Sequence, residues 1–227
     1  EFELLPTEYE ENRHFFLSTY FYDHYDEWAK NAPNPQSGIV INKVEIWTTN
    51  NSNSTSNYTT RNVVALADLG ETYNDEDVSE ELPQNSNGTL YNTVKNNPGI
   101  RDIQTASYSL GLIKKENGDS LEAAKDFEIL NNAKLLNASE YILNQELGYI
   151  SLKSSVNPDN IVAVAYEYTK GGKTYRVGEL TTSTTDTSKT STQNIYVKLI
   201  KSSIPAPNHK RLWNLAMKNI YSLGAYN

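Results

Sequence analysis

The stretch from Asn160 to Glu179 reads Asn-Ile-Val-Ala-Val-Ala-Tyr-Glu-Tyr-Thr-Lys-Gly-Gly-Lys-Thr-Tyr-Arg-Val-Gly-Glu, and it predicts a β-hairpin. Gly171 and Gly172 form a two-residue loop that can take the positive φ angles of a primed turn, with β-forming residues on both sides. Closing this loop predicts five cross-strand pairs: Lys170 with Lys173, Thr169 with Thr174, Tyr168 with Tyr175, Glu167 with Arg176, and Tyr166 with Val177. A shift of one residue would lose these matches, so the prediction includes the register.

Two further features of this stretch bear on its place and its chemistry. Residues 161–165 are apolar at every position, which is typical of a strand in the middle of a covered sheet. Gly172-Lys173-Thr174 looks like the end of a phosphate-binding loop, but the earlier glycine of that motif would fall at position 167. The chain has Glu167 there, and a carboxylate would repel phosphate. We therefore expect no nucleotide site.

The bulk composition sets outer limits on function. The chain has 227 residues and a formal net charge of −8, which argues against general nucleic-acid binding. It has no cysteine, so disulfides, thiol nucleophiles and cysteine-based zinc sites are excluded. It contains no apolar run of about 18 residues, so we expect no transmembrane helix. Its 16 tyrosines and single methionine are typical of exported or surface-exposed β-rich domains.

The pattern along the chain predicts an α+β fold. Apolar residues at helical spacing predict four helices, at residues 10–30, 102–113, about 119–133 and 209–223, with a shorter helical turn at 90–94. Alternating or continuous apolar runs predict strands outside the hairpin at residues 39–49, 61–69, 141–143, 149–152 and 194–201. The strands at 39–49 and 61–69 are expected to be antiparallel neighbours. The result is an antiparallel β-sheet with flanking helices and long polar loops.

The first predicted helix carries an aromatic stripe, which we interpret as core. The stripe consists of Phe15, Leu17, Phe21, Tyr22, Tyr25 and Trp28. The polar residues near it, His24 with Asp23, Asp26 and Glu27, lack a second ligand set for a metal. A solvated acidic face explains them.

No motif in the sequence reaches a catalytic or metal-binding constellation. The three histidines, His14, His24 and His209, never reach zinc-ligand spacing. The acidic run of Asp75, Glu76, Asp77, Glu80 and Glu81 suggests calcium binding. However, the Asp-x-Asp-x-Asp-Gly loop with a later glutamate, which is typical of calcium sites, is absent. A solvated loop is the favoured interpretation, and calcium binding stays open. We expect no catalytic residue, no cofactor and no metal site, hence no enzyme.

Six stretches, in order from about residue 9 to the end, carry a resemblance to a known family. They are Asn12-Arg13-His14-Phe15-Phe16-Leu17 through Tyr20-Phe21, Gly38-Ile39-Val40-Ile41 through Val44-Glu45-Ile46-Trp47, Thr60-Arg61-Asn62-Val63-Val64-Ala65 through Asp68-Leu69-Gly70-Glu71, Leu143-Asn144 through Leu147-Gly148-Tyr149-Ile150-Ser151-Leu152, Val162-Ala163-Val164-Ala165-Tyr166-Glu167-Tyr168, and Leu212-Trp213 through Met217-Lys218-Asn219-Ile220-Tyr221-Ser222-Leu223-Gly224-Ala225-Tyr226. Together they resemble an internal segment of the SprA/Sov family. Those large proteins of Bacteroidetes form the outer-membrane translocon of the type IX secretion system and take part in gliding motility.

The resemblance implies a non-enzymatic structural or interaction domain in protein secretion, located at the cell outer membrane and facing either the periplasm or the cell surface. Its implied partners are other outer-membrane or periplasmic proteins of the secretion system and exported cargo proteins. We expect residues 1–227 to form one soluble domain excised from the larger protein, with 1–9 and 224–227 as linker ends. A cell-surface glycan-binding module is the alternative, because Trp28 and Trp47 could stack on sugars.

Overall fold

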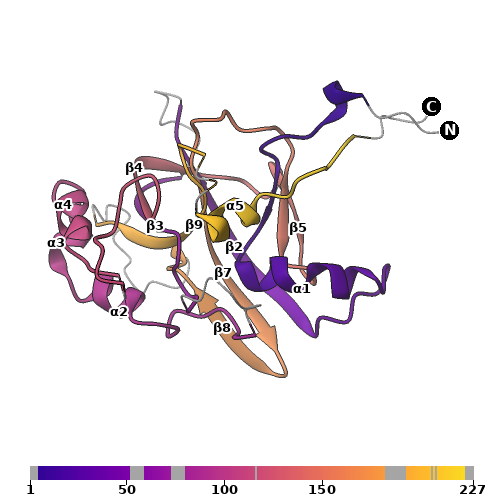
Figure 1. The fold of residues 1–227 in the computed structure, drawn as a ribbon, viewed down its shortest axis with the longest axis horizontal. Helices are drawn as coiled ribbons and strands as arrows, with labels where there is room; N and C mark the ends of the chain where they lie inside the picture. The colour runs from indigo at the N-terminus through magenta and orange to yellow at the C-terminus, as the bar shows by residue number, and fades with distance from the viewer. Residues whose placement is uncertain are drawn as a thin grey trace.

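The computed structural model describes residues 5–51, 59–72, 80–115, 117–181, 193–205, 207 and 209–222. Helices and largely antiparallel strands combine in an α+β fold, as the sequence predicts (Figure 1). Most of the Asn/Ser/Thr-rich loop at 50–60, most of the acidic run considered for calcium and most of the Thr/Ser-rich loop at 181–193 lie outside the described residues.

The predicted hairpin is confirmed in every pair. Strands β7 (Val162–Lys170) and β8 (Lys173–Val177) pair in the register set by the two-glycine loop. Gly171 and Gly172 have φ angles of 57° and 77°, which only glycine adopts without strain. The rings of Tyr168 and Tyr175 stack with centroids 5.2 Å apart.

The larger sheet closes on itself. Its strand order is β2 (Ile39–Thr48), β4 (Phe127–Leu135), β3 (Thr60–Leu66), β9 (Ile195–Lys201), β7, β8, and β2 also pairs with β7 along its length. The β3–β9 pair is parallel and the other pairs are antiparallel. Strand β7 therefore has neighbours on both edges, as its apolar residues predict.

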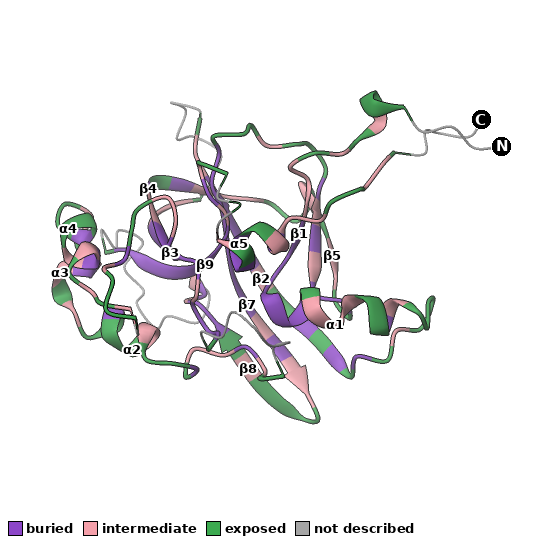
Figure 2. Ribbon diagram, in the orientation of Figure 1, coloured by how far each residue is buried: buried purple, intermediate pink, exposed green. Residues whose placement is uncertain are grey.

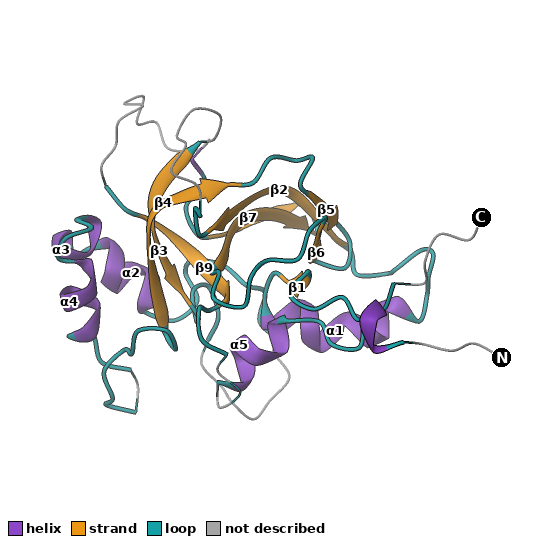
Figure 3. Ribbon diagram, turned by 90° about the horizontal axis from the view of Figure 1, so that it is seen from above, coloured by secondary structure: helices purple, strands orange, loops and turns teal. Residues whose placement is uncertain are grey.

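A second, three-stranded sheet has the order β1 (His14–Phe16), β6 (Tyr149–Leu152), β5 (Tyr141–Asn144). Its β5–β6 hairpin confirms the predicted one. Seen from above, helices α2 (Leu90–Lys95), α3 (Pro98–Arg101) and α4 (Ala106–Gly111) lie beside β3, away from α1 (Thr19–Ala29) and α5 (Lys210–Leu215) (Figure 3). Helix α4 covers only part of the predicted 102–113 helix. A short 3-10 helix, η1 (Pro6–Glu8), precedes β1.

The helix predicted at about 119–133 is wrong, because residues 127–135 form β4. Phe127, Leu130 and Ala133 are buried at helix-like intervals of three, but Phe127 packs with the α2–α4 helices whereas Leu130 packs on the opposite face of the sheet. A bulge then returns Ala133 to the face of Leu130, with Asn132 at a φ of 51°. A strand that is buried on both faces and contains one bulge therefore shows apolar residues at the spacing expected of a helix. Strand β4 also separates β2 from β3, so their predicted pairing is wrong.

The first and last predicted helices are both too long, for a shared reason. Phe15 in β1 pairs with Ala216, so neither segment is helical there. Helix α1 starts only at Thr19, and α5 ends at Leu215. The predicted core stripe is largely confirmed, since four of its residues are buried (Figure 2), although Tyr22 is 39% exposed. The buried four are Phe15, Leu17, Phe21 and Trp28.

The ends of the described chain lie together. Tyr9 forms a bridge with Tyr221, and their rings are 5.5 Å apart. The described part of residues 1–9 thus contacts the C-terminal segment. None of the helices within the described ranges has the length and apolar character needed to cross a bilayer.

The hairpin loop yields a stability prediction. Replacing Gly171 and Gly172 together by valine forces two β-branched residues to positive φ, at a cost of roughly 1–3 kcal/mol each. Urea unfolding should show a lower free energy of unfolding for this double variant than for the wild type. Lys173→Ala, next to the same loop, should leave the free energy of unfolding nearly unchanged. An unaltered midpoint in the double valine variant would contradict the role assigned to the loop.

Candidate functional site

The best candidate site is a cavity beside the end of α4, which we call the α4 cavity. It has a volume of about 360 Å³, within the usual range for ligand sites. Its walls come from α2, the segment after α4 and the β3–α2 connection. The apolar lining residues are Leu90, Leu112, Ile113 and Leu121, and the polar ones include Asp68, Glu71, Thr89 and Lys115.

A larger hollow of about 680 Å³ lies elsewhere, beside the ends of β2 and β6. Asn, Ser and Thr residues provide most of its lining, and two of its three charged groups, Lys134 and Glu140, form an ion pair at 2.6 Å. It lacks the α4 cavity's combination of apolar walls and buried charge, so we consider the smaller cavity the stronger candidate.

The floor of the α4 cavity rests on the buried carboxylate of Glu71. The side chain is 2% exposed and lies 2.8 Å from Lys198 Nζ and 3.3 Å from an Arg211 nitrogen. Thr19 donates its backbone N–H and its hydroxyl to the same carboxylate, at 2.6 and 2.9 Å. Burial by itself raises the pKa of Glu71, but the charges of Lys198 and Arg211 and these hydrogen bonds outweigh it and hold that pKa below its ordinary value.

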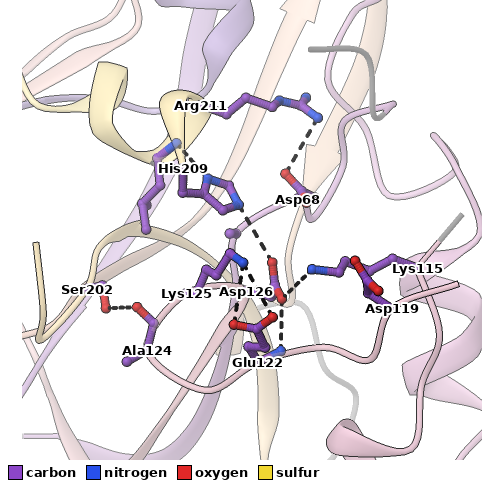
Figure 4. Close-up of polar contacts among 12 residues, drawn as sticks. Asp68, Lys115, Asp119, Glu122, Ala124, Lys125, Asp126, Ser202, His209 and Arg211 are labelled. Carbon is purple, nitrogen blue, oxygen red and sulfur yellow. Dashed lines mark hydrogen bonds and ion pairs between the residues drawn. The ribbon is translucent and has the colours of Figure 1, made fainter. Parts of the chain in front are cut away.

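A second acidic centre is Asp126, which pairs with Lys115 of the cavity lining (Figure 4). One carboxylate oxygen accepts hydrogen bonds from Lys115 Nζ at 2.9 Å and from the Glu122 backbone N–H at 2.8 Å. The other lies 3.8 Å from His209 Nε2. Burial lowers the pKa of Lys115, but the hydrogen bond and charge of Asp126 outweigh it and raise that pKa. His209 accepts from the Leu212 backbone N–H at the start of α5, so it also caps this helix.

Asp68 is a further carboxylate beside Arg211. Its Oδ1 is buried, accepts no hydrogen bond, and lies 3.5 Å from Arg211 NH1. Two charged groups therefore adjoin the cavity: Asp68 and Glu71 with Lys198 and Arg211, and Asp126 with Lys115. Because these charges balance and engage one another, they serve to hold α1, β9 and α5 together. The cavity above them can bind mainly through its apolar wall.

The outer rim of the α4 cavity is apolar and exposed. Tyr108 on α4 is 75% exposed and Leu112, four residues later, is 62% exposed. Residues four apart lie on the same face of a helical turn. Leu112 also lines the cavity, and Tyr108 extends the exposed apolar surface one helical turn beyond it.

One arrangement was not visible in the sequence. His14 lies between Glu10 and Ser151, with Nε2 2.7 Å from Glu10 Oε2 and Nδ1 2.8 Å from Ser151 Oγ. This order of groups resembles a catalytic serine relay. Yet Ser151 lies inside the β6 ladder, opposite Ile142, and the next amide, that of Leu152, donates to the Arg13 carbonyl at 2.8 Å. The relay therefore ties the N-terminal segment to β6.

The other sequence candidates have structural roles. His24 stacks on Trp28, with ring centroids 5.1 Å apart, and its Nδ1 donates a hydrogen bond to the Tyr20 carbonyl oxygen at 2.8 Å. Trp28 and Trp47 are 7% and 0% exposed, so they belong to the core and neither presents a face to a sugar. In the described part of the chain, no group of three His, Asp or Glu residues is placed to hold a metal ion.

The sequence matches none of the known family models, and no curated protein matches it.

The floor yields a prediction on stability and pH. Glu71→Gln removes the charge that pairs with two buried cations and should lower the free energy of unfolding at neutral pH by about 3–5 kcal/mol. A carboxyl group whose pKa is lowered on folding stabilises the fold above its unfolded pKa of about 4.5, and it loses that effect as pH falls through the folded-state pKa. The difference between variant and wild type should therefore narrow below pH 4.5.

Urea unfolding across that pH range measures the difference. Glu27→Gln, at an exposed position on α1, is the matched control and should change the free energy of unfolding little at any pH. A loss for Glu71→Gln that stays constant down to low pH would contradict the paired-charge explanation.

Proposed function

We propose that this chain is a non-enzymatic interaction domain of a protein-secretion translocon in the outer membrane, of the type IX kind, and that the α4 cavity with its rim is its partner-binding surface. The observation that supports a binding role is the continuity of exposed Tyr108 and Leu112 with a cavity of about 360 Å³. Contiguous exposed apolar surface is typical of interaction sites.

The polar groups beneath the cavity also favour binding over chemistry. Asp126 is occupied by Lys115 and Glu122, and Glu71 by Lys198, Arg211 and Thr19. General acid or base catalysis needs a group that can exchange a proton with a substrate. These carboxylates instead accept hydrogen bonds from groups that fix the fold, so the base of the cavity is held in place.

The resemblance to the SprA/Sov family supports the setting. It suggests other outer-membrane or periplasmic secretion proteins and exported cargo as the partners, and a role in secretion and gliding motility. An apolar socket suits such a partner, because a large apolar side chain inserted into it would become fully desolvated and act as an anchor of the interface.

Site-specific photocrosslinking in cells that make the whole protein tests this proposal. A photoreactive phenylalanine analogue at position 108 should crosslink to a discrete partner, and Leu112→Ser should reduce that product at least about tenfold through loss of apolar contact. Thermal stability should stay near wild type, because Leu112 is 62% exposed.

Ile142 provides the matched control, since it is also 62% exposed but lies on β5, outside the α4 cavity. Ile142→Ser should leave the product from position 108 unchanged. Equal loss from both serine variants, or no discrete product from position 108, would refute the assigned surface. Secretion of cargo by the Leu112→Ser cells then tests the translocon setting separately from the binding surface.

A further inference from the structure

A second surface, which shares no lining residue with the α4 cavity, lies where α5 meets the N-terminal segment. We call it the α5 groove. Its volume is about 190 Å³, and buried Phe15, Ile200 and Leu212 lie among its lining residues. The floor is thus part of the main hydrophobic core.

Exposed apolar side chains form the rim of the α5 groove. Ile204 is 61% exposed, Trp213 42% and Tyr9 38%. They come from the segment after β9, from α5 and from the N-terminal segment, which lie far apart in sequence. Trp213 is exposed because Arg211, Leu212 and Leu215 occupy the inner face of the six-residue α5.

Two lysines line the same groove without a carboxylate partner among the described residues. Lys201 donates to the carbonyls of Pro158, Asn160 and Ser202, which uses its three N–H groups. Lys218 donates to the carbonyls of Trp213 and Ala216 and lies 4.9 Å from the Trp213 ring centroid. Its third N–H has no acceptor among the described residues.

The surroundings of both lysines favour an anion. Desolvation lowers the pKa of each lysine. The carboxylates that act on Lys201, those of Asp159, Glu128 and Glu11, do so only beyond ion-pair distance. A carboxylate brought to the third N–H of Lys218 would gain a charge-assisted hydrogen bond.

We propose that the α5 groove binds an acidic segment of a partner polypeptide, with one large apolar side chain in the cavity and a neighbouring carboxylate on Lys218. A volume of about 190 Å³ lies below the ~300 Å³ lower end of drug-sized sites, so it suits a single side chain rather than a lipid tail. The groove lining carries Lys201 and Lys218 against one carboxylate, Glu11, so it is net positive on a chain with net charge −8, and an acidic partner meets attraction there.

Tryptophan fluorescence can follow this binding. Trp213 is exposed while Trp28 and Trp47 are buried, so changes in emission and in acrylamide quenching report mainly on the groove. The probe is the end-blocked tripeptide Glu-Phe-Glu, and the control peptide is Lys-Phe-Lys. The acidic peptide should shift the emission and protect Trp213 from the quencher, and the basic peptide should do neither.

Two substitutions test the lysine. Lys218→Gln should weaken binding of the acidic peptide about tenfold, the equivalent of losing a charge-assisted hydrogen bond. Lys173→Gln is the matched control, because Lys173 is an exposed lysine on β8 outside the groove, and it should leave the affinity unchanged.

A second pair of variants covers the case in which Lys218→Gln destabilises α5. Ile204→Glu and Ile204→Lys remove the same exposed apolar side chain but introduce opposite charges. The glutamate variant should weaken binding of the acidic peptide by at least about tenfold more than the lysine variant. Equal affinities would overturn the proposal.

Vesicles separate the peptide from a lipid surface. Mixed phosphatidylglycerol and phosphatidylcholine vesicles should leave the Trp213 emission unchanged. If they shift it in a Lys218-dependent manner while the acidic peptide does not, the groove binds membrane and the polypeptide proposal is wrong. Binding of both charged peptides with equal affinity would likewise refute it.

Discussion

The structure depends on a single buried carboxylate, that of Glu71. Its partners lie 52, 127 and 140 residues away in sequence, at Thr19, Lys198 and Arg211. A buried charge is tolerated only when it is paired and hydrogen-bonded, so Glu71 requires the start of α1, the middle of β9 and the first turn of α5 to meet at one point. The closed sheet provides this place, because Lys198 lies on a strand with neighbours on both edges.

The same requirement shapes the two surfaces proposed to bind partners. Arg211 must reach inward to Glu71 and Asp68, which turns the next residues of α5 so that Trp213 faces outward. The Arg211 partners Asp68 and Glu71 line the α4 cavity, and the other side of α5, with Trp213, forms a wall of the α5 groove. A helix of six residues can separate two surfaces because its buried face is fixed by charge as well as by Leu212 and Leu215.

How much the sequence predicts depends on how local the determinants are. The β7–β8 register follows from two glycines and five facing pairs within twelve residues, and it is confirmed completely. Strand β4 was predicted as a helix because burial on both faces and a bulge at Asn132 copy a helical spacing. Both effects depend on neighbours that single-sequence periodicity does not contain.

The candidate sites depend even more on distant contacts. Ser151 reaches His14 across 137 residues, and the groove combines Tyr9 with Trp213. Spacing rules for motifs could not find them, since such rules read residues that are close along the chain. The sequence did contain a weak signal for the Lys115–Asp126 pair. The two opposite charges lie on either side of a turn at Gly118, which can bring them together.

These contacts also decide what kind of function the described surfaces can support. Beneath and beside the α4 cavity, Glu71 pairs with Lys198 and Arg211, and Asp126 pairs with Lys115, and these contacts stabilise the fold. At the two cavities, exposed apolar side chains lie over that fixed framework, and affinity would come from desolvating a partner's side chain there. In the proposed binding role, a surface that is already formed before a partner arrives would lower the entropic cost of association.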